Sequence, residues 1–295
     1  MANLIRTSLK TTNDSIILTI PLVFFMWIIG AYVGYTQYTA NSLPEIILAV
    51  ITVLFMLGAF LSGWFYMVKK AVLLSKKVFV MDEDRAKAVL GLFKTIPTGI
   101  GKYFLSYIGM SFLIIVIFLV FAVVIYNIGI LLIGHLDLNA LQMKQAMSSP
   151  NDMKTFLDSL SEAQLLKMSY WNVLFMAGSA IASFFTFLWV PEIIFSTKNP
   201  FVALFKSIYK ILKKPLKTFG LFLFIGLMNI VLSFISTFAI YNPISYLIMM
   251  LIYFYFLVFI VVLLFTYYDR EYVEETEPAN TEETKKEDEN KSEEK

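Results

Sequence analysis

The sequence predicts an all-α fold, a polytopic membrane helical bundle with six transmembrane helices in three hairpin units and with cytoplasmic amphipathic helices. Hydrophobic residues make up 58% of the 295 residues and charged residues only 16%, against about 45–50% and about 25% in soluble domains. Long apolar runs recur along the chain, and Lys and Arg gather in alternate connections between them. These three observations exclude a single water-soluble core.

Six runs reach the length of about 20 apolar residues that crosses a hydrocarbon core about 30 Å thick. None contains Asp, Glu, Lys, Arg or His. The first run is too long for the apolar region of a signal peptide, and no small-residue cleavage site follows it, so we expect an uncleaved anchor. The predicted spans are residues 16–35, 46–68, 104–125, 171–190, 219–240 and 244–267.

The distribution of Lys and Arg predicts the orientation. From the N-terminus, the connections carry 2, 0, 8, 3, 6 and 0 basic residues. Under the positive-inside rule, both termini and the two most basic connections face the cytoplasm. We therefore expect a multi-pass protein of the cell membrane, namely of a bacterial cytoplasmic membrane. Residues 1–268 form the predicted transmembrane domain, and residues 269–295 form a disordered acidic cytoplasmic tail, because they are polar and carry 12 acidic and 5 basic residues.

Composition argues against an enzyme. The chain has no cysteine, which excludes thiolate chemistry, and its one histidine, His135, argues against a His-rich metal site. It has no Walker, zincin or nucleophile-elbow motif. The spans lack the ionisable residues that mark ion pathways, and we expect the nearest one, Glu192, to lie at the inner boundary beside a lysine. The sequence therefore predicts no catalytic residue, metal, cofactor or nucleic-acid partner.

An internal repeat underlies the three predicted units. Residues 4–7, 92–95 and 204–207 share the order Leu, apolar, basic, hydroxyl, and each precedes an outward-going span. Each unit is thus expected to be a cytoplasmic amphipathic segment followed by a helical hairpin. In the second unit, the first-turn acids Asp82–Asp84 suit a helix dipole better than a cation site, and the helix is expected to break between Pro97 and Gly101.

The amphipathic segment of the third unit has the clearest pattern. Asn199 is an expected N-cap, Pro200 an expected first helical residue, and Pro215 an expected end. An apolar stripe faces a lysine stripe, as in helices that lie in the membrane interface. This predicts contact with anionic lipids or a cytoplasmic protein, whereas the alternative is a basic loop that only sets orientation and packs beneath the bundle. The candidate contact residues are Lys94, Lys206, Lys210, Lys213, Lys214 and Lys217.

The connection at residues 135–170 is the only sizeable outer one, and it predicts a helical cap. Ser149-Pro150 is expected to open one helix, and Ser161 with Gln164 to form a capping box that opens another. The cap either covers the third and fourth spans or binds a ligand. The tail likewise either docks a cytoplasmic partner or stays solvated.

Polar and small residues within the spans suit close helix packing. The small pairs are Gly30 and Gly34, Gly58 and Ser62, and Gly178 and Ala182. A solute cavity between the fourth and fifth spans would use the same kinds of residue. The candidate packing or cavity residues are Asn172, Ser179, Ser183, Asn229 and Ser233.

Residues 190–224 carry a family resemblance. A span ends near Pro191, and a polar turn follows it. An amphipathic helix that contains Ala203-Leu204-Phe205-Lys206-Ser207 comes next and precedes a further span. This stretch resembles the repeat unit of bacterial six-helix integral membrane families, including the membrane domain attached to some glycerophosphodiester phosphodiesterases. Because the chain has no phosphodiesterase domain, the resemblance implies a membrane module without catalysis.

Two functions stay open at this point. The first is a non-enzymatic integral membrane protein that organises the membrane, or binds lipids or a partner, through basic interfacial helices. The alternative is a permease-like component for a small or lipidic solute.

Overall fold

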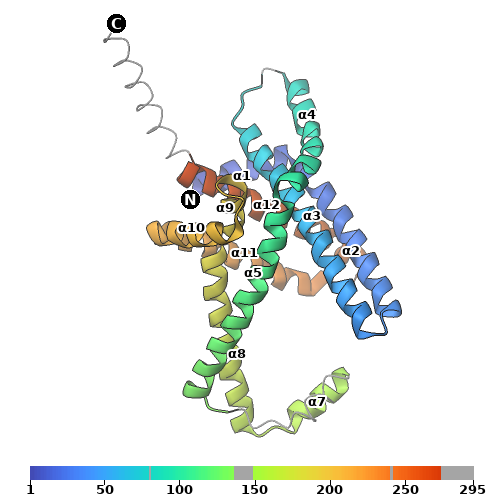
Figure 1. The fold of residues 1–295 in the computed structure, drawn as a ribbon, viewed down its shortest axis with the longest axis vertical. Helices are drawn as coiled ribbons and strands as arrows, with labels where there is room; N and C mark the ends of the chain where they lie inside the picture. Colours follow the sequence, from blue (N-terminus) through green and yellow to red (C-terminus); the bar gives the residue numbers. More distant parts are fainter. Residues whose placement is uncertain (80, 136–148, 240–241, 274–295) are drawn as a thin grey trace. The chain divides into compact units, whose positions relative to one another are not determined.

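The computed structural model describes residues 1–79, 81–135, 149–239 and 242–273, and these residues form helices and no strand (Figure 1). This confirms the predicted all-α class. The longer elements are α1 (Ala2–Asp14), α2 (Thr19–Thr39), α3 (Leu43–Ser75), α4 (Asp82–Leu90), α5 (Thr95–Leu132), α7 (Pro150–Asp158), α8 (Glu162–Thr186), α9 (Trp189–Phe195), α10 (Pro200–Lys213), α11 (Pro215–Ala239) and α12 (Pro243–Tyr268).

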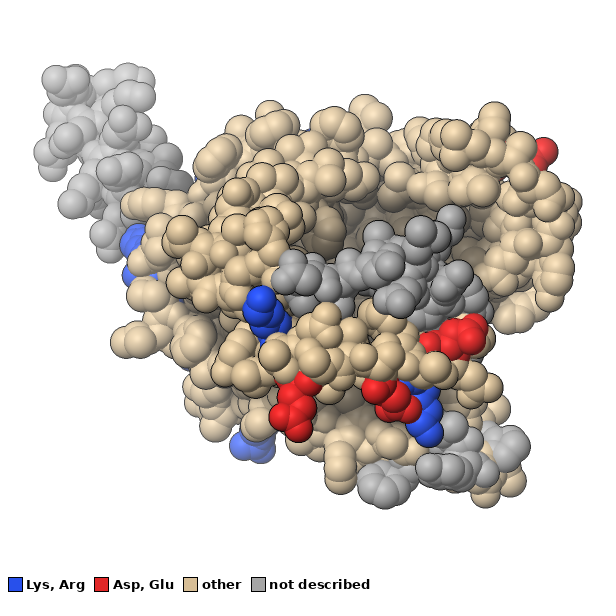
Figure 2. Space-filling model, turned by 90° about the horizontal axis from the view of Figure 1, so that it is seen from below, with Lys and Arg blue, Asp and Glu red and all other residues tan. Residues whose placement is uncertain are grey.

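Six helical segments within the described ranges are long and apolar enough to cross a membrane, as predicted. They are built on α2, α3, α5, α8, α11 and α12. Much of their apolar surface is exposed, for example at Trp27, Phe118 and Phe234, each about two-thirds exposed or more. Lys, Arg, Asp and Glu are sparse over the face of the molecule in Figure 2. Apolar side chains that face outward along whole helices indicate a lipid-facing surface.

The chain divides into two compact units, and each is described by itself. Unit 1 contains residues 1–113 and 187–295, and unit 2 contains residues 114–186. The C-terminal half of the third predicted span and nearly all of the fourth thus belong to unit 2. The other four spans belong to unit 1.

Helix α12 lies at the centre of unit 1, where α1, α2, α3, α9 and α11 all pack against it. Its buried side chains include Val258, Val262 and Phe265. The indole of Trp64 on α3 donates a 2.9 Å hydrogen bond to the carbonyl of Leu18, the residue before α2, and so fixes the first turn of α2 against α3. The apolar α12 therefore forms the core against which these helices of unit 1 pack.

Helices α3 and α5 approach closely through glycines. A Cβ at Gly99 would lie 2.9 Å from the Gly63 Cα, and one at Gly58 would lie 2.7 Å from Ile108. Ser62 is buried at the same contact, as its spacing from Gly58 predicts. Gly30 and Gly34 behave differently, because nothing lies within 4 Å of a Cβ at either position. The prediction that this pair packs closely is therefore wrong among the described residues.

Unit 2 is a hairpin of α5 and α8 with α7 before it. A Cβ at Gly178 on α8 would lie 2.5 Å from Phe121 and 2.6 Å from Ile125 of α5, so the predicted small-residue position is a packing contact. Ser149 accepts a 3.1 Å hydrogen bond from the Asp152 amide at the start of α7. Ser161 and Gln164 form the expected capping box. The helix that they open, α8, continues into the fourth span. Residues 136–148 of the predicted cap lie outside the described residues.

The structure adds detail at three predicted boundaries. The fourth predicted span, residues 171–190, lies within the candidate membrane segment Glu162–Phe195, but its helix is interrupted, because α8 ends at Thr186 and α9 starts at Trp189. Pro191 explains the break, since it has no N–H and its ring clashes with the carbonyl four residues earlier. The predicted break after residue 96 is absent, because Pro97 lies in the first turn of α5, where proline is tolerated. A short 3-10 turn, Gly91–Lys94, separates α4 from α5 instead.

The third boundary is the start of the tail. Residues Asp269–Val273 form a π-helical turn that continues α12, and Asp269 is buried. They therefore belong to the folded chain and not to a disordered segment. The physical reason is that the carboxylates of Asp269 and Glu271 form ion pairs, as described below. Residues 274–295 of the predicted tail lie outside the described residues.

Candidate functional site

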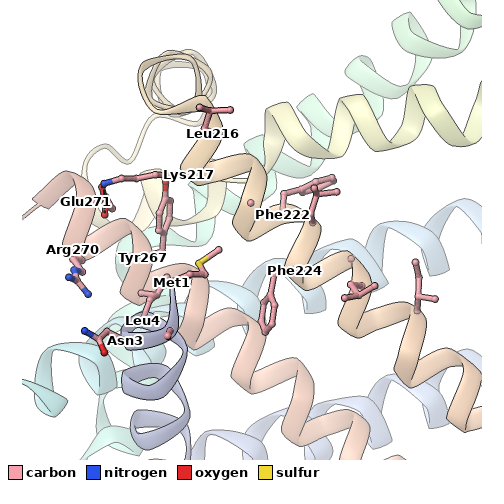
Figure 3. Close-up of a pocket in the computed structure, with 16 residues that line it drawn as sticks. Met1, Asn3, Leu4, Leu216, Lys217, Phe222, Phe224, Tyr267, Arg270 and Glu271 are labelled. Carbon is pink, nitrogen blue, oxygen red and sulfur yellow. Dashed lines mark hydrogen bonds and ion pairs between the residues drawn. The ribbon is translucent and has the colours of Figure 1, made fainter.

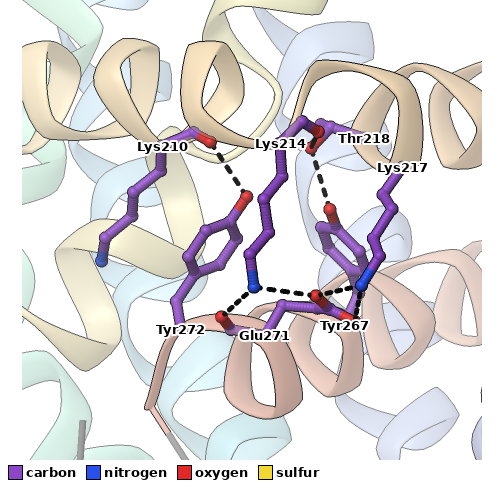
Figure 4. Close-up of polar contacts among 7 residues, drawn as sticks. All are labelled: Lys210, Lys214, Lys217, Thr218, Tyr267, Glu271 and Tyr272. Carbon is purple, nitrogen blue, oxygen red and sulfur yellow. Dashed lines mark hydrogen bonds and ion pairs between the residues drawn. The ribbon is translucent and has the colours of Figure 1, made fainter. Parts of the chain in front are cut away.

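Charged and aromatic side chains of unit 1 gather where α12 ends. We call this group the helix-end cluster, and Figure 4 shows part of it. It joins the last turns of α12 to the ends of α3, α9, α10 and α11. Its members are Lys76, Glu192, Lys210, Lys214, Lys217, Tyr267, Tyr268, Asp269, Glu271 and Tyr272.

Glu192 is the most deeply buried member. Its side chain is fully buried on α9, and its Oε2 accepts a 2.8 Å ion-pair contact from the Lys210 ammonium. The same oxygen accepts a 2.5 Å hydrogen bond from the Tyr268 hydroxyl. The Lys210 ammonium also lies 4.6 Å from the centre of the Tyr268 ring. The sequence-based expectation that Glu192 lies beside a lysine is thus confirmed, and the pair ties α9, α10 and α12 together.

Glu271 bridges two further lysines (Figure 4). Its Oε2 lies 3.0 Å from the Nζ atoms of both Lys214 and Lys217, and its backbone carbonyl accepts a 3.1 Å hydrogen bond from Lys214. Beside this bridge, the Tyr267 and Thr218 hydroxyls share a 2.8 Å hydrogen bond. The start of α11 is therefore held against the end of α12 by charge as well as by packing.

Two more contacts complete the connections between helix ends. Asp269 forms an ion pair with Lys76, the residue that follows α3. The Ile194 carbonyl at the end of α9 accepts hydrogen bonds from the Lys69 ammonium, at 2.8 Å, and from the Tyr103 hydroxyl, at 3.1 Å. A lysine or tyrosine thus satisfies a carbonyl that the end of a short helix leaves without a helical partner.

The predicted lysine contacts therefore divide into two groups. Lys210, Lys214 and Lys217 form ion pairs with acids of the same chain. Lys94, Lys206 and Lys213 are exposed, and within the described part of the chain they form no ion pair. Sequence reasoning missed Asp269 and Glu271 as partners because it assigned both to the tail. The dense run of aromatic and charged residues at 267–272 was the available signal.

Helix α10 presents three different faces. It starts with the predicted cap, since the Asn199 side chain accepts hydrogen bonds from the amides of Phe201, at 3.0 Å, and Val202, at 3.3 Å. One face is buried against the protein, the next carries Lys206, Lys210 and Lys213, and the last is apolar and exposed. The buried face consists of Ala203, Ser207 and Ile211, and the exposed apolar face of Phe201, Phe205, Tyr209 and Leu212.

Contacts at its start fix the direction of α10. The Trp189 indole donates a 2.9 Å hydrogen bond to the Pro200 carbonyl, and the Ser106 hydroxyl donates a 2.5 Å bond to the Lys198 carbonyl. Pro200 packs on Gly109, where an added Cβ would lie 2.9 Å from the proline ring. Helices α5 and α9 therefore hold α10 so that its apolar face points away from unit 1.

A cavity of about 1200 Å³ opens between the N-terminal end of α1, α11 and the end of α12 (Figure 3). Lys217, Arg270 and Glu271 lie at one end of it, and Phe222 and Phe224 lie farther along α11. A second cavity, of about 600 Å³, lies between α1, the end of α3 and α4, and its lining includes five cationic residues.

The candidate polar residues of the fourth and fifth spans fall in different units. Asn172, Ser179 and Ser183 are exposed in unit 2, and Asn229 and Ser233 are exposed in unit 1. The Tyr253 hydroxyl donates a 3.4 Å hydrogen bond to Asn229, so this asparagine links α11 to α12. None of the five lines either cavity described above.

Comparison with known proteins adds no family: no family model, curated protein or solved structure matches the chain. The resemblance of residues 190–224 to bacterial six-helix membrane families stays a prediction.

Proposed function

We propose that this chain is a non-enzymatic integral membrane protein that binds the anionic surface of the cytoplasmic leaflet through α10. The observation that carries the proposal is the division of α10 into a buried face, a basic face and an exposed apolar face. An apolar face in the acyl boundary with lysines at the head groups is the arrangement of interfacial helices. The proposal includes an amphipathic role for α10 and a cytoplasmic location for both termini.

The ion pairs narrow the proposal to particular lysines. Lys210 is already paired with the buried Glu192, and Lys217 with Glu271. Lys206 and Lys213 lie on the same face of α10 and are exposed. A lysine near an anionic leaflet contributes about 1 kcal/mol. We therefore assign the lipid contact to Lys206 and Lys213 together with the exposed Phe201 and Phe205.

Binding of reconstituted protein to lipid tests this proposal. The variant Lys206→Gln/Lys213→Gln, in vesicles that contain 30 mol% phosphatidylglycerol, should reduce enrichment of the anionic lipid around the protein about thirtyfold, since two contacts of about 1 kcal/mol are lost. Spin-labelled phosphatidylglycerol and phosphatidylcholine report this enrichment. The control Lys154→Gln/Lys167→Gln removes the same charge from unit 2 and should leave it unchanged. Equal enrichment in both variants would refute the proposal.

The orientation has an independent test. The chain has no cysteine, so single cysteines can be introduced without background labelling. A cysteine at Asn41, between α2 and α3, should react with an impermeant maleimide added to intact cells. A cysteine at Lys206 should react only after the cells are opened. Labelling of both positions from outside would overturn the topology.

The permease-like alternative receives no support from a particular observation. Its candidate residues lie in separate units and line neither cavity. It would regain support if Asn229→Leu abolished solute flux in vesicles while the protein kept its fold.

A further inference from the structure

We infer that the cavity between α1, α11 and α12 is a discrete binding site for one anionic phospholipid. The phosphate would lie at Arg270, beside the Lys217–Glu271 ion pair, and one acyl chain would lie along α11. This inference rests on the proposed function, because both assign anionic lipid as the partner. It differs in naming a single lipid position, in the cavity between α1, α11 and α12 and not on the exposed faces of α10.

The shape of the cavity fits a lipid chain. Its volume of about 1200 Å³ exceeds the range of about 300–1,000 Å³ that is typical for small-ligand pockets. The lining follows α11 from Leu216 to Ile230. Fourteen residues of helix at 1.5 Å each cover about 21 Å, somewhat more than half of the roughly 30 Å hydrocarbon core. The lined part of α11 is therefore long enough to lie along an acyl chain of one leaflet, which takes up about half of that core.

The lining changes in polarity along that length. Lys217, Arg270, Glu271 and the Tyr267 side chain lie at one end, close to the last turn of α12 (Figure 3). The remainder of the α11 wall is apolar or consists of glycine. These residues are Gly220, Phe222, Leu223, Phe224, Gly226, Leu227 and Ile230. A molecule with a charged head and a long apolar chain matches this gradient.

The charge at the polar end selects an anion. Among the described residues that line the cavity, Glu271 is the one carboxylate, and it is already held by both Lys214 and Lys217. Arg270 is exposed and, within the part of the chain that the structure describes, forms no ion pair. Its guanidinium presents several donors in a planar fork that matches phosphate geometry. The positive charge in excess at this end lies where a head group would meet the apolar wall.

The glycines in the α11 wall keep the cavity open. Nothing lies within 4 Å of a Cβ at Gly226, and only the end of the Met1 side chain comes near one at Gly220, at 3.9 Å. A larger side chain at Gly226 can therefore enter the cavity without displacing the backbone. Gly30 on α2 is equally unobstructed but does not line the cavity, which makes it a matched control.

Native mass spectrometry of the full chain in detergent tests the inference. The protein is titrated with phosphatidylglycerol or phosphatidylcholine, and bound lipids are counted. We expect one retained phosphatidylglycerol in the unsubstituted protein and in Gly30→Leu, and at least tenfold weaker retention in Gly226→Leu. Arg270→Gln should weaken retention of phosphatidylglycerol about fivefold and leave retention of phosphatidylcholine unchanged, which corresponds to one lost contact of about 1 kcal/mol.

The outcomes separate this inference from the proposed function. If Gly226→Leu and Arg270→Gln retain phosphatidylglycerol as the unsubstituted protein does, the discrete site is refuted, whatever the α10 variants show. Equal retention of both lipids by the unsubstituted protein refutes it as well, because the cavity is then an ordinary lipid-facing groove. Should Gly226→Leu lose its helical circular dichroism, Leu227→Trp provides a second test, since Leu227 lines the cavity and is 61% exposed.

Discussion

Removing the ammonium of Lys210 should destabilise unit 1 strongly, although this residue lies on the face of α10 that carries the exposed Lys206 and Lys213. The substitution Lys210→Met keeps most of the side-chain volume and leaves the Glu192 carboxylate without its cation. Glu192 is fully buried, and its Oε1 has no hydrogen-bond partner among the described residues. The Tyr268 hydroxyl alone would then stabilise the charge.

The size of the effect follows from burial. Removing one partner of a buried ion pair costs about 3–5 kcal/mol, because the other charge is left uncompensated. The Lys210 side chain is 22% exposed, so water can partly replace it, and we expect the lower end, about 3 kcal/mol. The double variant Glu192→Gln/Lys210→Met removes both charges and keeps an acceptor for Tyr268. It should lie within about 1 kcal/mol of the unsubstituted protein.

Unfolding in mixed micelles measures these differences, with SDS titration followed by far-ultraviolet circular dichroism. Lys206→Met is the matched control, since Lys206 lies one turn earlier on α10 and is exposed. It should change the free energy of unfolding by less than about 0.5 kcal/mol. The reasoning is wrong if Lys210→Met is as stable as Lys206→Met, or if the double variant is no more stable than Lys210→Met.

Three further predictions concern helix contacts and caps. Gly99→Ala should destabilise the protein by about 1–3 kcal/mol, because the added methyl meets the α3 backbone at 2.9 Å, whereas the unobstructed Gly101→Ala should not, in the same titration. Ser149→Ala should cost α7 about 1 kcal/mol, seen as faster amide hydrogen exchange in residues 150–158 with exchange of α12 unchanged. Glu45→Ala removes the acceptor of the Asn41 and Ser42 amides, at 2.8 and 3.0 Å, and should accelerate exchange at the start of α3 alone; a change spread over the whole chain would contradict this local role.

The reach of sequence reasoning is clear from particular elements. The six spans, the Asn199 cap of α10 and the Ser149 cap of α7 depend on residues close together in the chain, and all were predictable. Pro97 and Pro191 were harder, because the same residue is tolerated in the first turn of α5 and interrupts the helix between α8 and α9. Whether a proline lies inside a helix or at its start depends on where the preceding turn ends.

The candidate site was only half predictable for a related reason. The lysines of α10 were recognisable as a stripe and Glu192 was expected beside a lysine, but Asp269 and Glu271 were not recognised as partners. Glu192 and Lys210 are 18 positions apart, Lys214 and Glu271 are 57 apart, and Lys76 and Asp269 lie still farther apart in the chain. The polar run that ends α12 resembles the start of a solvated tail when read locally.

By itself the sequence determined the all-α class and the six apolar helices that are long enough to span a membrane. These properties depend on hydropathy over about 20 residues and on backbone groups near helix ends. Only the tertiary structure decided which lysines are paired within the chain and which of them remain exposed, and only it formed the cavity between α1, α11 and α12. Those properties depend on which helix ends meet in space, because an ion pair or a cavity requires side chains that come from distant parts of the chain.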